Sequence, residues 1–305
     1  MKKILILGGS GMLGSMVCDY LESTQEYDIT ATVRNNELLL KCKAILPKIK
    51  WELFNIENEI QIYSDLEKLG RFDYIINCIG ITKPYCKDDN PEQVEVAIRV
   101  NSLFPHILGK YADKYNITVL QIATDCVYSG KSSLYDEKSE FDPIDVYGKT
   151  KSLGEAYYNS VKNLRCSIIG PEFKTQAFLL EWVLKQSDGV EINGFTNHNW
   201  NGVSTLQFAK ICDGIMKNNI ELTHIQHIIP LDILNKYQLV SIFAKYFNKK
   251  IIINKTTAAL AIDRTLSTIN QNQNSKIWKA AGYSTIPTLE DMTIELSEYN
   301  YRFKQ

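Results

Sequence analysis

A tyrosine, a lysine and a threonine are the residues of this chain best suited to moving a proton. Tyr147 and Lys151 stand four residues apart in the run YGKTK, so a helix would place both side chains on one face, one turn apart. A free phenol has a pKa of about 10 and transfers protons poorly at neutral pH, but a nearby ammonium stabilises its phenolate. Thr124 ends an earlier apolar run and could donate a hydrogen bond to the same carbonyl oxygen. The three side chains therefore suit proton transfer to or from a carbonyl oxygen.

A glycine-rich loop near the amino terminus is the second chemical feature. Gly8, Gly11 and Gly14 lie in the run GGSGMLG, between an apolar run and an amphipathic helical pattern. This spacing permits a tight turn, brings backbone N–H groups close to a pyrophosphate and lets the helix pack closely on the strand. A structural turn without a ligand is the alternative. The position between strand and helix favours dinucleotide binding, and the predicted contacts are Gly8, Ser10, Gly11, Met12, Leu13 and Gly14.

The end of the second predicted strand distinguishes between two dinucleotides. In NAD-binding proteins a carboxylate at this place, about 20 residues beyond the loop, bonds the ribose 2′-OH. Here the stretch reads ATVRNN, which contains Arg34 and no acid. Because a guanidinium can pair with a 2′-phosphate, we expect NADP(H) rather than NAD(H). The alternative is that Arg34 is a solvated surface side chain.

These residues belong to a regular alternation of short apolar runs and helical segments over the first 170 residues. The predicted strands are Lys3–Leu7, Ile29–Val33, Trp51–Phe54, Tyr74–Cys78, Val119–Ala123 and Cys166–Ile169. The predicted helices cover Met12–Leu21, Gln93–Tyr115 and Tyr147–Tyr158. Such alternation is typical of βαβ units, so the predicted fold class is α/β, with a doubly wound, Rossmann-type parallel sheet.

The pattern becomes less regular after Pro171. Predicted helices are Ala177–Gln186, Ser204–Lys217, Ile233–Phe247 and Leu289–Tyr299, with short strands near His224–Ile229 and Ile251–Ile253. Asn270–Asn274 is expected to be an exposed loop, and Phe178 and Trp182 are expected in the core. We expect residues 1–170 to form the dinucleotide-binding domain, with some later elements returning to it, and residues 171–305 to form a smaller substrate-binding lobe.

The composition excludes several classes of protein. The 305 residues carry 34 Lys+Arg against 35 Asp+Glu, so no basic field would attract nucleic acid or an anionic membrane. Seven cysteines without a C-x-x-C pair indicate free thiols in a reducing compartment. The apolar run in MKKILILGG is too short for a signal peptide, and the spacing of His224 and His227 does not suit a metal site. We expect a soluble, cytoplasmic protein without a metal.

Four motifs, GGSGMLG, NCIG, TDCVYSG and YGKTKSLGE, occur in this order along the chain. Together they resemble the motifs of the extended short-chain dehydrogenase/reductase superfamily. Within it the chain is most similar to the dTDP-4-dehydrorhamnose reductase-like group, which reduces 4-keto nucleotide sugars. The motifs cover about the first 160 residues, while Gly202–Leu206 and Asp263–Leu266 match more loosely.

The resemblance implies roles for particular residues. It implies the catalytic set Thr124, Tyr147 and Lys151, in which Lys151 also holds the nicotinamide ribose. Asn101 would support the site from the long helix. Asn55 and Ile56 stand where the family usually has an aspartate that contacts the adenine amino group, and the asparagine carbonyl can still accept that hydrogen bond. The other implied cofactor contacts are Cys78, Ile79 and Gly80.

A nucleotide sugar needs cations for its diphosphate and flat or polar groups for its base and sugar. The candidate substrate-binding residues are Lys83, Thr124, Asp125, Lys174, His198, Trp200 and Arg264. The lysines, Arg264 and His198 could equally be ordinary surface side chains, and Trp200 could be a packing residue.

These features predict an NADP(H)-dependent reductase of a 4-keto (deoxy)sugar nucleotide, with hydride added to the keto carbon and a proton given to its oxygen by Tyr147. One alternative is an epimerase or dehydratase of the same superfamily; the related dehydratases carry a glutamate where this chain has Cys126, a poor base at neutral pH. The other is a non-catalytic NADP-binding regulatory subunit, since the group includes a regulatory subunit of methionine adenosyltransferase. The predicted partner is the nucleotide sugar, and a homodimer is the assembly we consider.

Overall fold

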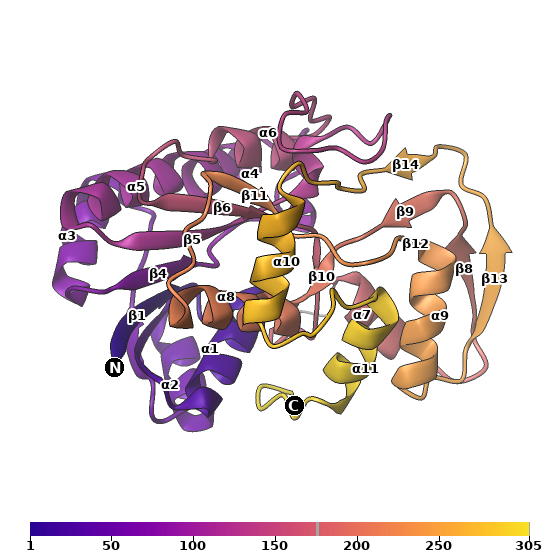
Figure 1. Ribbon diagram of the computed structural model, residues 1–305, viewed down its shortest axis with the longest axis horizontal. Coiled ribbons are helices and arrows are strands. Elements are labelled where there is room, and N and C mark those ends of the chain that lie inside the picture. Colours follow the sequence, from indigo (N-terminus) through magenta and orange to yellow (C-terminus); the bar gives the residue numbers. More distant parts are fainter. Residues whose placement is uncertain (175–176, 305) are drawn as a thin grey trace.

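The computed structural model describes residues 1–174 and 177–304. A seven-stranded parallel sheet forms its centre, with strand order β11-β6-β5-β4-β1-β2-β3 (Figure 1). Its strands are β1 (Lys2–Leu7), β2 (Tyr27–Val33), β3 (Lys50–Leu53), β4 (Tyr74–Asn77), β5 (Thr118–Ala123), β6 (Val161–Arg165) and β11 (Ile225–His227). The chain winds outward from β1 to β3 and then crosses to β4. This reversal creates a crevice at the carboxyl ends of β1 and β4, where ligands bind in such sheets.

Helices cover both faces of the sheet, and β1 shows why. Ile4 and Ile6 point to one face, while Leu5 and Leu7 point to the other, and all four are fully buried. The first face is covered by α1 (Met12–Thr24), α2 (Asn36–Ile45) and α8 (Thr205–Lys217). The second is covered by α3 (Glu59–Leu69) and α5 (Phe104–Tyr115). The predicted doubly wound α/β fold is therefore confirmed.

A long helical segment runs beside β4 and β5. It consists of α4 (Pro91–Ala97), a π-helical stretch (Ile98–Leu103) and α5, so it begins two residues before the predicted range 93–115 and ends with it. A shorter helix, α6 (Val146–Leu153), ends at Gly154 rather than continuing to Tyr158 as predicted. Two 3₁₀ turns, Lys83–Tyr85 and Asp125–Val127, follow β4 and β5. These segments surround the carboxyl ends of the two strands.

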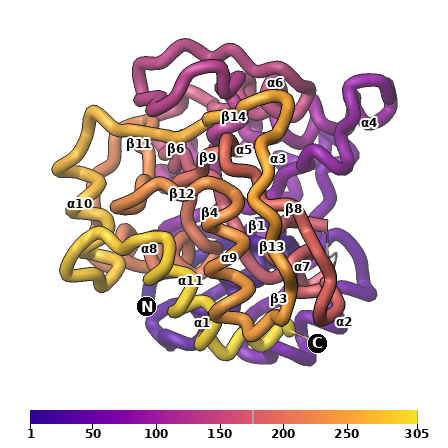
Figure 2. The backbone as a smooth tube through the Cα atoms, turned by 90° about the vertical axis from the view of Figure 1, so that its right-hand side faces the viewer, coloured from indigo at the N-terminus to yellow at the C-terminus, as the bar shows by residue number. Residues whose placement is uncertain are grey.

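The later residues build small sheets beside the main one. They pair β7 (Ile168–Ile169) with β10 (Val203–Ser204), β8 (Glu191–Phe195) with β13 (Ile252–Thr256), and β9 (His198–Trp200) with β12 (Leu234–Asn235) and β14 (Ile262–Asp263). Helices α7 (Leu179–Leu184), α9 (Lys236–Tyr246) and α11 (Leu289–Glu298) accompany them, and β8 and β13 lie side by side in both views (Figures 1 and 2). In contrast, β11 is an edge strand of the seven-stranded sheet, and α8 covers one face of that sheet. Helix α10 (Gln271–Ala280) packs on α8.

Two predictions about secondary structure and one about burial were wrong. The sixth strand is Val161–Arg165 rather than Cys166–Ile169, because its Asn163 and Arg165 are polar yet fully buried. Asn270–Asn274 does not form an exposed loop: α10 begins at Gln271, and the buried Asn274 side chain bonds both the N–H and the carbonyl of Ile229. Trp182 is 40% exposed on α7 and lies outside the core.

No helix within residues 1–174 and 177–304 is both long enough and apolar enough to span a lipid bilayer.

Candidate active site

The glycine loop connects β1 to α1 at the crevice. Gly11 caps α1 without a side-chain hydrogen bond, so N–H groups of the first helical turn point outward without a side-chain partner. A Cβ atom at Gly14 would overlap the carbonyl oxygen of Gly8, which shows how closely α1 approaches the strand. This geometry suits a pyrophosphate, because bare backbone donors and a helix N-terminus face the same space.

Tyr147 lies against the end of β5 because α6 approaches that strand very closely. A Cβ atom at Gly148 would overlap the carbonyl oxygen of Cys126. Asp145 caps α6 by accepting a 2.8 Å hydrogen bond from the Gly148 N–H. The Thr124 side chain lies near the Tyr147 phenol and favours its ionised form. The fold thus brings together the first two members of the expected set.

Burial keeps the Tyr147 phenol protonated. Desolvation, together with the adjacent groups Cys126 and Asp125, raises the pKa of Tyr147 well above its usual value, although the Thr124 side chain opposes the shift. The four-residue spacing of Tyr147 and Lys151 predicts instead that the ammonium lowers this pKa. In the structure the desolvation of the phenol is the largest influence on this pKa. The phenol therefore carries the proton that a donor must give, while the raised pKa by itself makes it a weaker acid.

Lys151 is buried one turn along the same helix. Its Nζ donates a 2.9 Å hydrogen bond to the Ile122 carbonyl oxygen on β5, and only 7% of the residue is exposed. Desolvation lowers the pKa of Lys151 to about 8, and the carboxylate of Glu155 opposes this shift. The ammonium is thus fixed at β5 by a residue one helical turn from Tyr147, with two of its three N–H groups available for other partners.

Asn101 joins the loop after β4 to α6. Its amide accepts a 2.9 Å hydrogen bond from the Ile81 N–H and donates to the Ile81 carbonyl and to Thr150 Oγ1 at 2.9 and 3.1 Å. The side chain of Asn77, at the end of β4, accepts a 3.1 Å bond from the Ile79 N–H. These bonds hold Cys78, Ile79 and Gly80 in a defined wall opposite the glycine loop. Asn101 therefore supports the site from the π-helical stretch.

Asp125 and Cys126 follow Thr124 in a 3₁₀ turn. Thr124 Oγ1 donates a 3.1 Å hydrogen bond to Asp125 Oδ1 and accepts a 3.2 Å bond from the Cys126 N–H. Desolvation raises the pKa of Asp125, and Arg264 opposes the shift. Desolvation also raises the pKa of the Cys126 thiol to about 12, so this side chain stays protonated near neutral pH and is a poor base.

Three cations gather beside this turn. Lys83 Nζ lies 2.7 Å from Asp145 Oδ2, and Arg264 Nε donates a 2.7 Å hydrogen bond to the Tyr128 carbonyl oxygen. The third is Lys236, at the start of α9; burial and the charges of Lys83 and Arg264 lower its pKa. No sequence motif surrounds Lys236, and only the fold brings the start of α9 next to the loop after β4.

Lys174 is the predicted substrate contact that the fold places elsewhere. Its Nζ donates a 3.0 Å hydrogen bond to Ser10 Oγ in the glycine loop. The charge of Arg34, which follows β2, also acts on it. Lys174 therefore lies at the cofactor side of the crevice rather than with the other three cations.

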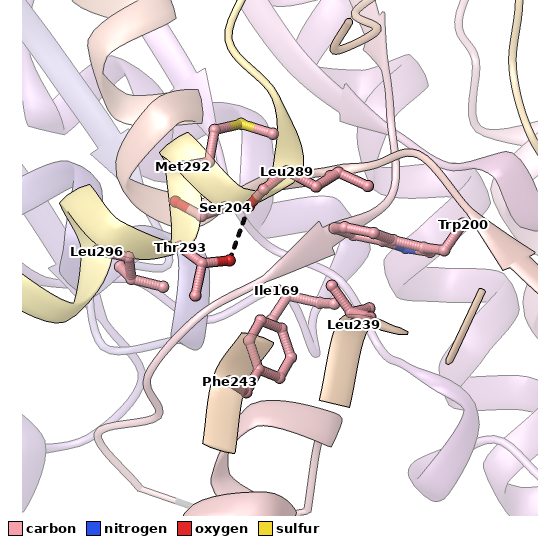
Figure 3. Close-up of a pocket in the computed structure, with 9 residues that line it drawn as sticks. All are labelled: Ile169, Trp200, Ser204, Leu239, Phe243, Leu289, Met292, Thr293 and Leu296. Carbon is pink, nitrogen blue, oxygen red and sulfur yellow. Dashed lines mark hydrogen bonds between the residues drawn. The ribbon is translucent and has the colours of Figure 1, made fainter. Parts of the chain in front are cut away.

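Trp200 packs into a small apolar cavity between the small sheets and two helices (Figure 3). The cavity has a volume of about 10 Å³, room for about one water-sized sphere, and is lined by Ile169, Trp200, Ser204, Leu239, Phe243, Leu289, Met292, Thr293 and Leu296. This environment supports the alternative that Trp200 is a packing residue. His198 on the same strand has its Nε2 2.9 Å from the Leu260 carbonyl oxygen.

Asn55 uses its side chain locally. Its Oδ1 accepts a 2.9 Å hydrogen bond from the Glu57 N–H in the exposed turn after β3. A carbonyl oxygen has a second lone pair, so this bond leaves one acceptor position on Asn55 beside the half-buried Ile56.

Comparison with known protein families gives a clear match. The family model described as the RmlD substrate binding domain matches residues 1–169, more than half of the chain. The chain belongs to this family.

Curated proteins similar to this RmlD-family chain match about half of its length. A probable low-salt glycan biosynthesis reductase from Haloferax volcanii is 28% identical over 151 residues, covering 49% of this chain and 46% of the relative. A dTDP-4-dehydrorhamnose reductase from Aggregatibacter actinomycetemcomitans is 27% identical over 156 residues, covering 51% of this chain and 46% of the relative. Methionine adenosyltransferase 2 subunit beta from Xenopus laevis is 27% identical over 154 residues, with 50% and 42% covered. Each match spans slightly less than half the length of the relative.

Solved structures similar to the RmlD-family chain cover almost all of it. The dTDP-4-dehydrorhamnose reductase from Bacillus anthracis in complex with NADP has a TM-score of 0.74 at 18% identity, covering 97% of this chain and 98% of that one. The UDP-glucuronic acid 4-epimerase from Bacillus cereus in complex with UDP-glucuronic acid and NAD has a TM-score of 0.74 at 17% identity, covering 98% of both chains. These likenesses show that the fold extends over both parts of the chain.

Proposed function

We propose that this protein is an NADP(H)-dependent reductase of a 4-keto sugar nucleotide. The observation that carries the proposal is the group Thr124, Tyr147 and Lys151 at the end of β5, beside the bare N-terminus of α1. A bound nicotinamide would supply the hydride for the keto carbon. Tyr147 would give its proton to the keto oxygen, so that the carbonyl becomes an alcohol. Relatives named as a probable glycan biosynthesis reductase and as a dTDP-4-dehydrorhamnose reductase support this reaction class.

The residues present fit such a cofactor. The first turn of α1 would meet the pyrophosphate, and Lys151 would hold the nicotinamide ribose with an N–H that the Ile122 carbonyl leaves available. Asn55 and Ile56 would meet the adenine, and Arg34 the ribose 2′-phosphate. In this assignment residues 1–170, with α8 and β11, hold the cofactor, and the other elements of residues 171–305 hold the substrate.

The substrate diphosphate would bind at Lys83, Arg264 and Lys236. Three cations that face one region repel one another, and the lowered pKa of Lys236 reflects this repulsion together with burial. A diphosphate would offset the repulsion through charge-assisted hydrogen bonds. Asp125, beside Thr124, would then meet the sugar.

Turnover with a panel of 4-keto nucleotide sugars tests the proposal. We expect stoichiometric oxidation of NADPH, followed by its absorbance, with the product alcohol seen by NMR. A second assay supplies unoxidised hexose nucleotides and catalytic NADP⁺. Formation of a 4-keto-6-deoxy sugar there would identify a dehydratase and overturn the reductase assignment; epimerised product without net NADPH oxidation would identify an epimerase.

The match to methionine adenosyltransferase 2 subunit beta favours a second candidate, a non-catalytic NADP-binding subunit. NADPH binding in calorimetry, combined with no oxidation across the whole panel, would favour this candidate. The grouping of Thr124, Tyr147 and the buried Lys151 at the end of β5 favours catalysis, because binding alone does not need a phenol one helical turn from a fixed ammonium.

A further inference from the structure

Lys174 connects the segment after β7 to the glycine loop between β1 and α1. It follows β7, and its Nζ donates a 3.0 Å hydrogen bond to Ser10 Oγ, 164 positions earlier in the chain. Ser10 is only 4% exposed within the glycine loop. The ammonium of Lys174 thus lies against the loop that would receive a dinucleotide, while much of its side chain is exposed.

Packing holds the backbone beside Lys174 in place. The ring of Phe173 contacts the buried Phe303 edge-on, with ring centroids 4.9 Å apart. Tyr301 in the same carboxyl-terminal tail makes a 2.6 Å hydrogen bond with Ser15 on α1. The glycine loop leads directly into α1, so the carboxyl-terminal tail contacts both Phe173 and the helix that follows the loop. These contacts hold the residue before Lys174 near the glycine loop, where Lys174 bonds Ser10.

Arg34 and Lys174 form a pair of cations without an acidic partner in the described chain. The salt bridges that residues 1–174 and 177–304 make with one another include neither residue. Partial desolvation and the charge of Arg34 lower the pKa of Lys174. Two uncompensated like charges beside a buried hydroxyl would be stabilised by an anion that contacts all three groups.

We propose that Lys174, with Arg34 and Ser10, binds the 2′-phosphate of NADP(H), so that Lys174 is a second determinant of cofactor preference. This inference rests on the proposed function. Arg34 follows β2, where the ribose 2′ position is recognised in this type of sheet, whereas the pyrophosphate belongs at the N-terminus of α1. The 2′-phosphate is therefore the group that both cations can reach.

Two fragments of the cofactor distinguish binding of the 2′-phosphate from binding of the pyrophosphate. Adenosine 2′,5′-bisphosphate carries the 2′-phosphate without a pyrophosphate, and ADP carries the pyrophosphate without a 2′-phosphate. Calorimetry with Lys174→Gln is expected to weaken binding of the bisphosphate and of NADPH about tenfold to hundredfold, the usual worth of a charge-assisted hydrogen bond. Binding of ADP and NADH is expected to stay within about twofold of the wild-type values.

Two further variants complete the test. Lys174→Arg, which keeps the charge, is expected to retain most of the preference. Lys185→Gln removes an exposed charge after α7 and is expected to change neither fragment's affinity. Equal weakening of ADP and the bisphosphate by Lys174→Gln, or no weakening of either, would overturn the inference while leaving dinucleotide binding intact. If the wild-type protein bound neither NADPH nor NADH, the proposed function itself would fail.

Discussion

At the scale of single residues, Tyr147 is expected to be the proton donor. Tyr147→Phe removes the hydroxyl and keeps the ring, so NADPH binding should persist while turnover falls by about 10²- to 10⁴-fold. Tyr157→Phe is the matched control, because Tyr157 is 85% exposed beyond the end of α6. Steady-state kinetics of both variants, on a substrate identified among the 4-keto nucleotide sugars, would measure turnover. Turnover near the wild-type value in Tyr147→Phe would remove this residue from the mechanism.

Lys151 should make folding stability depend on pH in a particular direction. Its folded pKa of about 8 lies below the ordinary lysine value of 10.5, so between these values the unfolded state binds more protons. Stability contributed at this position therefore rises as pH increases through that window, by on the order of 3 kcal/mol. Urea unfolding of the wild type and of Lys151→Met, from pH 7 to 10.5, measures the difference.

The control for this pH effect is Lys149→Met, which removes an exposed lysine from the same helix. Its stability relative to the wild type should not change over this range. A constant difference between the wild type and Lys151→Met would show that Lys151 titrates normally in the folded protein.

At the scale of elements, the close approach of α6 to β5 positions the site. Gly148→Ala would place a Cβ atom against the Cys126 carbonyl oxygen and push α6 away from the strand. We expect a loss of about 1–3 kcal/mol of stability and reduced turnover, because Tyr147 would move away from Thr124. Lys149→Ala, one residue along and exposed, should retain both properties. Thermal unfolding and kinetics of the two variants test this; wild-type turnover in Gly148→Ala would contradict it.

At the scale of the whole molecule, the carboxyl-terminal tail joins the last residues to α1. Arg302 pairs with the fully buried Asp19 and with Glu22, and its guanidinium also donates a 2.7 Å bond to the Asp19 carbonyl. Arg302→Met would leave the Asp19 carboxylate buried without its cation, and we expect a loss of about 3 kcal/mol at pH 7. Lys304→Met, an exposed change in the same tail, should cost far less.

This loss should itself depend on pH. Burial already raises the pKa of Asp19, and Arg302 opposes the shift. Removing Arg302 would raise that pKa further, so the folded variant would bind a proton more readily than its unfolded state. The deficit should therefore shrink as pH falls from 7 towards 5. Unfolding curves at both pH values measure it, and an equal or larger deficit at pH 5 would argue against this role of Asp19.

Local patterns in the sequence determined the fold class and the centre of the candidate site. Apolar runs that alternate with helical segments indicated the parallel sheet, because each element must bury one or both of its faces. The glycine loop and the Tyr147–Lys151 spacing were visible because a strand-to-helix turn and one helical turn are short-range geometry. The structure brings Thr124, Tyr147 and Lys151 together at the end of β5.

Only the tertiary structure decided the placement of polar residues whose partners are distant in sequence. Arg165 reads as a surface residue, yet it is fully buried on β6 because Glu155, Tyr128 and His227 satisfy its guanidinium. Asn274 enters the interior because it can bond the backbone at Ile229. In the same way, folding brings Lys236 towards Lys83 and Arg264, and Lys174 towards Ser10. Side-chain periodicity reports burial of apolar faces, whereas a buried or clustered charge depends on partners that only the folded chain supplies.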